Sequence, residues 1–245
     1  MRYRCTIVNT VSPKRKYFIV CLRLFYIKII DILYICNMGN YSKEVFRKTL
    51  HCVAIALFIV WLYLYDDWTI SVVYFLRAAC IVAPILFLGS RIPGITAFFN
   101  ARKQGEYTTS YLVFVIMYAV VATVCWGVLG ERMLVVACVA AWGPGDAAAA
   151  LIGKKFGKHK IGKEQRKSLE GTIAMFVFSL LSVLITLYYY GKYPLPYMLL
   201  ISVLTTLVTA FTEFKILNGS DTFFCPVAAM AVLVPFELIF RYLII

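Results

Sequence analysis

The sequence AWGPGDAAAALIGKKFGKHKIGKEQRKSLEG, at residues 141–171, changes from an apolar half to a strongly basic half. The first half is apolar enough to lie in a membrane, yet it contains a carboxylate, Asp146, among glycines, a proline and four alanines. A charged group at such a depth is costly and usually functional. Against one acid, Glu164, the second half carries seven bases: Lys154, Lys155, Lys158, Lys160, Lys163, Arg166 and Lys167. We interpret the stretch as a place where a metal ion and phosphates meet at a membrane surface.

The composition predicts an integral membrane protein. Of the 245 residues, 62% are hydrophobic and only 15% are charged, which leaves too little polar surface for a soluble globule. A helix needs about 20 apolar residues to cross the hydrocarbon, and seven such stretches follow residue 49. We therefore predict an all-α bundle of about seven transmembrane helices, formed by residues 38–245 as one membrane-embedded domain.

Charge and cysteine content argue against other classes of protein. The net charge is +13, but most bases lie in short loops beside apolar stretches, where they set topology and meet anionic lipid or substrate phosphate. We therefore expect no nucleic-acid partner. The eight cysteines form no C-x-x-C pair, so neither a zinc site nor a disulfide framework is indicated.

The N-terminal residues 1–37 have an uncertain relation to this domain. Their apolar run, residues 17–36, is interrupted by Arg23, Lys28 and Asp31, which makes a spanning helix costly. Two interpretations stay open: an interfacial amphipathic helix, or an extension that contributes nothing to the fold.

The predicted spans alternate across the bilayer. One span follows Arg132 and carries Asp146, and the others cover residues 50–65, 70–89, 110–129, 169–190, 197–211 and 222–243. The excess of bases in alternate loops places those loops in the cytoplasm. The segments around Lys48, Asp146, Lys167 and Asp221 then reach the same cytoplasmic face, so we predict that they build one site.

Glu44, Arg47, Lys48 and His51 share one helical face by their spacing, and this face enters the membrane with the first span. This face is either a topology signal with snorkelling side chains or part of the site.

Around Asp146 the residue types predict irregular backbone. The preceding G-P-G predicts a broken or kinked helix whose freed backbone lines a cavity or is buried in protein. The small residues 147–150 and Gly153 let helices approach closely. Asp146 either pairs with an arginine inside the bundle or coordinates Mg²⁺ or substrate, and we favour coordination.

The basic loop resembles a phosphate-binding P-loop only superficially. Residues 157–164, GKHKIGKE, end in Glu164 where Mg²⁺ binding needs Ser or Thr, and no strand is expected before them. Clustered lysines and glycines still suit a triphosphate, and the alternative is a solvated topology signal. Ser168 is the predicted N-cap of the next helix, whose free N–H groups beside Lys167 form an anion site. Glu170 either favours the helix dipole or binds metal.

Three further acids lie in or near the last two spans. Glu213 and Asp221 reach the face where Asp146 arrives, and oxygen ligands from separate helices are what Mg²⁺ on a nucleotide requires. Alternatively, Asp221 caps the last span. Glu237 lies deep in that span without a neighbouring motif, and stays a candidate as an intramembrane carboxylate.

These blocks resemble the CTP-dependent lipid kinases, which comprise dolichol kinase, phytol kinase, yeast-type diacylglycerol kinase and bacterial relatives. The resemblance covers most of the chain from Glu44 onward. It rests on E-x-x-R-K-x-x-H, on G-D-x-x-A-x-x-x-G-K-K-F-G and on K-S-x-E-G, which are matched by Glu44, Arg47, Lys48, His51, Gly145, Asp146, Ala149, Gly153, Lys154, Lys155, Phe156, Gly157, Lys167, Ser168, Glu170 and Gly171. Near the end the family has an acid and then D-N-x-x-x-P, and here Thr222 stands in place of the asparagine, which puts the fine coordination in doubt.

The resemblance implies transfer of the CTP γ-phosphate to the hydroxyl of a lipid alcohol such as a polyprenol, phytol or diacylglycerol. Mg²⁺ would be held by Asp146 and Asp221 together with Glu213. Asp146 and Lys167 would be catalytic, with Asp146 accepting the hydroxyl proton. The expected nucleotide-binding residues are Arg47, Lys48, Lys154, Lys155, Lys160, Lys167 and Ser168.

The middle block also resembles CDP-diacylglycerol synthase, which joins phosphatidate to the α-phosphate of CTP. That family ends in a long K-D-x-x-x-x-x-P-G-H-G-G-x-x-D-R signature, whereas Val-Ala-Ala-Met follows Pro226 here. The missing signature favours a kinase. A transporter is not favoured, because the charged residues follow no midplane pathway and show no repeat symmetry.

Overall fold

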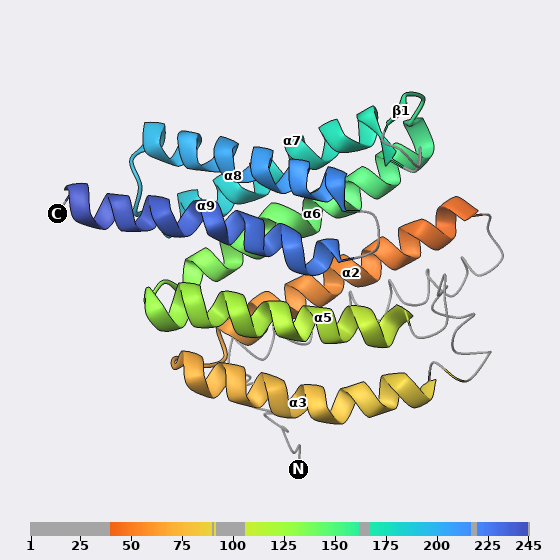
Figure 1. Cartoon of the computed structure of the whole chain (residues 1–245), viewed down its shortest axis with the longest axis horizontal. Helices are drawn as coiled ribbons and strands as arrows, with labels where there is room; N and C mark the ends of the chain where they lie inside the picture. The colour runs from red at the N-terminus through yellow and green to blue at the C-terminus, as the bar shows by residue number, and fades with distance from the viewer. Residues whose placement is uncertain (1–39, 90, 92–105, 162–166, 217–219, 245) are drawn as a thin grey trace, which may run out of the picture. The chain divides into compact units, whose positions relative to one another are not determined.

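The computed structural model describes residues 40–89, 91, 106–161, 167–216 and 220–244 (Figure 1). The chain divides into two units, residues 1–43 and 44–245, and the membrane helices belong to the second unit apart from the first residues of α2. The two interpretations of residues 1–37 lie outside the described residues, as do Lys163, Glu164 and Arg166 of the basic loop.

Seven stretches of helix among the described residues are long and apolar enough to cross a membrane, so the predicted all-α bundle is confirmed. A two-stranded antiparallel hairpin, the only sheet in the described chain, lies between α6 and α7. The elements are α2 (Asn40–Leu62), α3 (Trp68–Gly89), α5 (Glu106–Val121), the π-helix η2 (Ala122–Val128), α6 (Arg132–Phe156), β1 (Lys160–Ile161), β2 (Lys167–Ser168), α7 (Leu169–Tyr190), α8 (Leu195–Lys215) and α9 (Asp221–Ile244).

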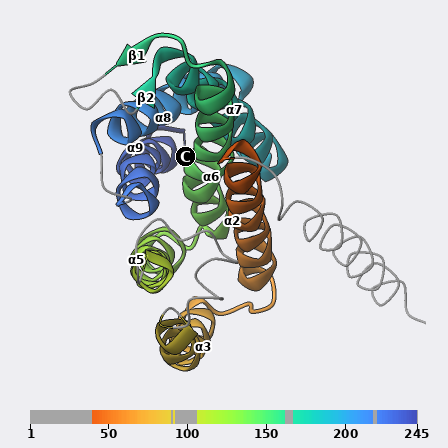
Figure 2. The same ribbon diagram turned by 90° about the vertical axis from the view of Figure 1, so that its right-hand side faces the viewer.

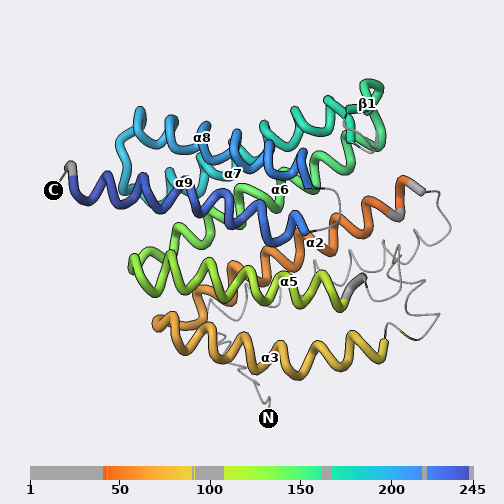
Figure 3. The backbone as a smooth tube through the Cα atoms, viewed as in Figure 1, coloured from red at the N-terminus to blue at the C-terminus, as the bar shows by residue number. Residues whose placement is uncertain are grey.

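The helices run back and forth, so their ends gather at two levels, as the tube in Figure 3 shows. We call one level the hairpin end: it holds β1 and β2, the starts of α7 and α9, and the last turns of α6 and α8. The part of α2 that belongs to the second unit begins at this level too, where Glu44 lies beside Lys154 of α6. The far end holds the turns after α2 and η2, the α7–α8 turn and the last turn of α9.

Helix α6 is the central helix of the bundle. It packs against α7, α8, α9 and η2, and Figure 2 shows it end-on between α7, α9 and α2. Its side chains are buried on all sides from Leu134 to Ala148, apart from Pro144. A helix that is apolar all round belongs in an interior, and the many alanines and glycines of α6 let its neighbours come close.

The sequence predicted a broken or a kinked helix before Asp146, and the break is wrong, because α6 continues through Gly143, Pro144 and Gly145. A Cβ on Gly143 would lie 2.1 Å from Ile55 Cδ1 of α2, and a Cβ on Gly145 would lie 2.0 Å from Ser179 Oγ of α7. Both glycines therefore serve close helix packing, although Pro144 removes one helical hydrogen bond.

A cluster of aromatic rings packs α2 against α3 and α5. Phe58 meets Phe75, Phe114 and Tyr118 edge-on, at centroid distances of 5.1–6.4 Å. Outside this cluster, α3 exposes large apolar side chains such as Ile81 and Leu88, as expected of a helix that faces lipid.

Candidate functional site

The centre of the candidate site is a buried ion pair between α2 and α6. Lys48 Nζ donates to Asp146 Oδ2 at 2.5 Å, and both residues are more than nine-tenths buried. His51 Nε2 lies 3.6 Å from the same oxygen and has no hydrogen-bond partner among the described residues. Asp146 stands ten residues before the end of α6, which is about 15 Å of helix. The pair is therefore buried well below the hairpin end, within the length of α6.

A second acid, Asp221, reaches this centre from the first turn of α9. Its carboxylate interacts electrostatically with Asp146 and Lys48. The buried Nε1 of the Trp142 indole has no hydrogen-bond partner among the described residues. The same indole packs edge-on against His51 at 4.6 Å between ring centroids. Both acids thus interact with the buried ammonium of Lys48.

Further bases surround this centre on the water side. Arg47 Nη2 donates to the buried carboxylate of Glu44 at 2.5 Å. Lys154 Nζ, on the last turn of α6, lies 3.7 Å from the other oxygen of Glu44. Lys155 lies with its ammonium 5.2 Å from the Phe156 ring centroid. The structure therefore brings the predicted α2 face and the basic end of α6 together, over Asp146.

The corner between α6 and α7 is built by the residues of the K-S-x-E-G block. Ser168 is the N-cap of α7, as predicted, because its Oγ accepts a hydrogen bond from Gly171 N at 3.2 Å. Glu170 accepts hydrogen bonds at 3.2 Å from the backbone N–H groups of Lys158 and His159, and contacts His159 Nδ1 at 2.8 Å. Glu170 is thus turned toward the hairpin and away from Asp146.

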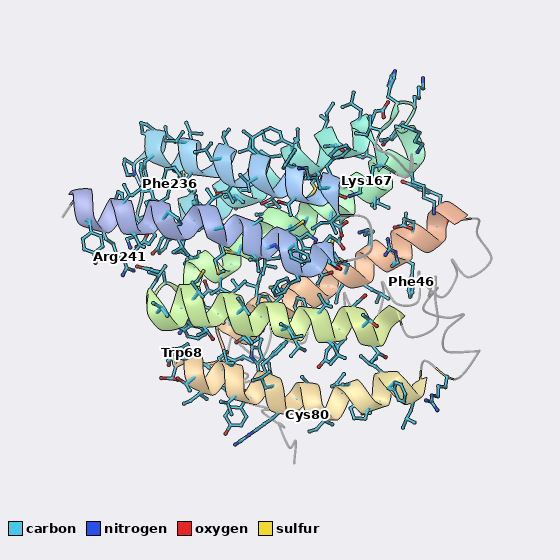
Figure 4. All side chains as sticks on the ribbon, in the orientation of Figure 1. Phe46, Trp68, Cys80, Lys167, Phe236 and Arg241 are labelled. Atoms are coloured by element: carbon cyan, nitrogen blue, oxygen red, sulfur yellow. The ribbon has the colours of Figure 1, made fainter. Side chains whose placement is uncertain are left out.

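Lys167 and Glu213 contact each other at the same end. Lys167 Nζ lies 2.7 Å from Glu213 Oε1, and it also donates to Glu213 O and, at 2.9 Å, to Ile216 O. Figure 4 labels Lys167 at the hairpin end of the ribbon. Glu213 interacts electrostatically with Asp146 and Asp221, so this pair borders the centre. Lys160 is exposed on β1.

The predicted three-carboxylate metal set is not assembled as a ready metal cage. Among the described residues, no group of three or more His, Cys, Asp or Glu side chains is arranged to hold a metal ion. Asp146 and Asp221 interact electrostatically, whereas Glu213 is paired with Lys167.

Comparison with known proteins gave one curated relative of note. No family model matches the chain, and no solved structure matches it. The relative is the probable phytol kinase 1, chloroplastic, of Glycine max, which is 32% identical over 132 residues. The chain is similar to a phytol kinase. The matched region covers 49% of this chain but only 41% of the relative, so the similarity supports a relationship to lipid kinases, and activity is a matter for proposal.

A second polar cluster lies at the far end, and no sequence motif predicted it. Glu237 is fully buried on α9, accepts hydrogen bonds from Lys192 and Tyr193, and receives Arg241 Nε at 2.5 Å. Glu131 accepts from Lys192 at 2.7 Å and from Arg241 at 2.5 Å. We call these five residues the far-end network. The i,i+4 spacing of Glu237 and Arg241 was the available signal.

The far-end network is balanced in charge, with two acids and two bases. Burial by itself would raise the pKa of Glu131, but hydrogen bonds and charges from Lys192, Tyr190 and Arg241 lower that pKa below its ordinary value. Burial and the hydrogen bond to Glu237 raise the pKa of Tyr193. Because its charges are paired, this network stabilises the fold, and it offers no open position for a substrate.

Proposed function

We propose that this integral, multi-pass membrane protein is a kinase that transfers the γ-phosphate of a nucleoside triphosphate to the hydroxyl of a lipid alcohol. The resemblance of its motifs indicates CTP as the donor and a polyprenol, phytol or diacylglycerol as the acceptor. The observation that carries the proposal is the buried centre of Lys48, Asp146 and Asp221, with Arg47 and Lys154 at its edge. The similarity to a phytol kinase supports it.

The donor set fits Mg²⁺ bound together with a nucleotide. Mg²⁺ on a nucleotide takes one or two protein carboxylates and completes its octahedron with phosphate oxygens and water. Asp146 and Asp221 are the two carboxylates that we assign to Mg²⁺, beside the buried ammonium of Lys48. When bound, Mg²⁺ would neutralise charge on the phosphates.

The chain's own residues would contribute to phosphoryl transfer through their positions and charges. Phosphoryl transfer depends chiefly on alignment and on neutralising the equatorial oxygens. Arg47, Lys48, Lys154 and Lys155 are the bases that we assign to the phosphates. The lipid oxygen forms a bond to the γ-phosphorus, the bond from that phosphorus to the bridging oxygen breaks, and Asp146 takes the hydroxyl proton. The products are a lipid monophosphate and a nucleoside diphosphate.

We infer that the hairpin end faces the cytoplasm. Lys154, Lys155, Lys158 and Lys160 lie there, and bases concentrate on the cytoplasmic side of membrane proteins. A lipid head group would then enter from the bilayer and the nucleotide from the cytosol. Single cysteines at positions 158 and 66, both exposed, in a background without native cysteines, should react with impermeant reagents from opposite sides. Labelling of both from one side would contradict this topology.

The activity is tested with purified protein, Mg²⁺, lipid alcohols and CTP labelled at the α or γ position. Entry of the γ label into lipid is the expected result. Entry of the α label would identify a cytidylyltransferase instead, and no transfer with CTP or ATP would overturn the proposal. Asp146→Asn should lower the rate at least 100-fold, because a removed charge at a preorganised site costs about 10²–10³ in rate. Asp66→Asn, at the exposed far-end turn, is the matched control.

A further inference from the structure

The ammonium group of Lys167 contacts the C-terminal end of α8. A lysine has three N–H donors, and the structure offers this one three acceptors, namely Glu213 O, Ile216 O and Glu213 Oε1. The last carbonyls of a helix have no partner within the helix, and a positive charge there is favourable. Lys167 therefore acts as a C-terminal cap of α8, with its donors directed at α8 and away from Asp146.

The backbone of Lys167 is itself held in place. Ile161 and Lys167 are partners in the β1–β2 ladder, and the next residue, Ser168, lies among three glycines. A Cβ on Gly157 would lie 2.6 Å from Ser168 Oγ, and a Cβ on Gly153 or Gly171 would lie 3.0 or 3.2 Å from it. A side chain at any of these three glycines would therefore crowd Ser168. The cap on α8 thus extends from a tightly packed α6–α7 corner.

The end of α8 determines where α9 begins. Ile216 follows the last helical residue, and Asp221 is the first residue of α9, so four residues separate the capped carbonyl from the second acid of the centre. Displacing the end of α8 would displace Asp221 with respect to Asp146 on α6. Helix α8 packs along α9, and the Glu213 carboxylate interacts electrostatically with Asp221, so a shift of α8 reaches Asp221 through this packing.

We propose that Lys167 is a positioning residue, which fixes the end of α8 on the α6–α7 corner and so sets Asp221 opposite Asp146, with Glu213 as its partner. This inference rests on the proposed function and deepens it. It assigns Lys167 to the alignment of the metal-binding carboxylates, where the resemblance would place it on a phosphate. It also assigns Glu213 to Lys167, where the resemblance would place it on the metal.

The test compares Lys167→Met, Glu213→Gln and the double variant in the full-length protein. Mn²⁺ binding, followed by the electron paramagnetic resonance of free Mn²⁺, reports the carboxylates without turnover. We expect Lys167→Met to weaken Mn²⁺ binding about tenfold, as for residues that orient metal ligands. The double variant should bind Mn²⁺ no more weakly than the weaker single variant, because coupled residues are not additive. The unfolding temperatures should show the same lack of additivity.

Kinetics separate positioning from phosphate binding. Positioning predicts a lower kcat and a higher Mg²⁺ requirement for Lys167→Met, with an unchanged KM for CTP at saturating Mg²⁺. Lys167→Arg should restore most of the activity, because a guanidinium still donates to the α8 carbonyls. Lys158→Met removes an exposed charge beside the same hairpin and should leave Mn²⁺ binding unchanged.

Two results would overturn the inference. One is a raised KM for CTP with unchanged Mn²⁺ binding, which indicates a phosphate contact. The other is a further loss of Mn²⁺ binding when Glu213→Gln is added to Lys167→Met, which indicates a metal ligand. If Lys167→Met does not accumulate, Glu213→Gln and Lys167→Arg carry the same comparison. Absence of phosphotransfer by the wild type would defeat the proposed function, while the binding and unfolding data would still judge the Lys167–Glu213 contact.

Discussion

Among single side chains, the Lys48–Asp146 pair carries most of the argument for a site. Both groups are removed from water, and a buried ion pair stabilises a fold weakly because each charge has lost its hydration. His51 and Trp142 add buried nitrogen atoms without full hydrogen bonds beside the pair. Buried polar groups without hydrogen bonds are costly to a fold. A purely structural role therefore does not explain this cluster, and a binding role is favoured.

Removal of Lys48 should destabilise the fold, because the buried carboxylate of Asp146 then lacks its partner. Lys48 is the only ion-pair partner among the described residues that hydrogen-bonds to Asp146. We therefore expect Lys48→Met to lose about 3 kcal/mol in the free energy of unfolding. The double variant Lys48→Met/Asp146→Asn should regain part of it. Denaturation in mild detergent measures both. Equal stabilities of the wild type and Lys48→Met would show that the pair is solvated.

Among the helices, the contact of α6 with α7 depends on the absence of a side chain at Gly145. The Cβ of an alanine would meet Ser179 Oγ at 2.0 Å and Met175 O at 3.0 Å. Ser179 is fully buried, and its Oγ has no partner among the described residues. The two helices therefore approach closely at the level of Asp146, and the geometry of the site depends on that contact.

Gly145→Ala should separate α6 from α7. We expect a loss of about 1–3 kcal/mol in the free energy of unfolding, as for other overpacked interiors. Ser179→Ala removes the nearest clashing atom, so Gly145→Ala/Ser179→Ala should recover part of the loss, while Ser179→Ala alone should change little. Thermal unfolding of the three variants checks this. No recovery in the double variant would place the clash at the Met175 backbone.

For the bundle as a whole, polar groups gather at both ends and apolar packing lies between them. The far-end network ties the turn after η2, the α7–α8 turn and α9 together. Figure 4 labels Arg241 at this end, with Lys167 at the other. The separation predicts that stability and catalysis respond to different residues.

Glu237→Ala should destabilise the protein without altering the site. It removes the buried acid and leaves Lys192 and Arg241 with the partly exposed Glu131 alone, and we expect a loss of about 3 kcal/mol in the free energy of unfolding. Phosphotransfer per folded molecule and Mn²⁺ binding should stay unchanged. A fall in kcat at a temperature where the variant is fully folded would contradict the independence of the two ends.

Acid should weaken the far-end network through Glu131. Because the pKa of Glu131 is lower in the folded protein than its ordinary 4.5, its charge stabilises the fold fully above that value, and this contribution is lost as pH falls through the folded pKa. Glu131→Gln should therefore unfold at a lower temperature than the wild type at pH 7, with a smaller difference below about pH 4.5. A difference that does not depend on pH would rule out the charge as its source.

The sequence by itself determined the spans, their alternation and the cap at Ser168. Crossing a bilayer requires about 20 apolar residues whatever the neighbours are, and a serine cap depends on N–H groups within three residues of it. The site's ingredients were recognisable for the same reason, since a carboxylate as deep as Asp146 is costly wherever its partner lies.

Only the tertiary structure decided which charges meet. Lys167 finds its acceptors on α8, and Glu131, Lys192 and Glu237 converge from three separate segments. The glycines before Asp146 were misjudged, because a glycine's sequence context does not distinguish a broken helix from a close approach between helices. Such contacts depend on shapes and distances across the bundle, which come from the packing of all seven spans together and not from any single stretch of chain.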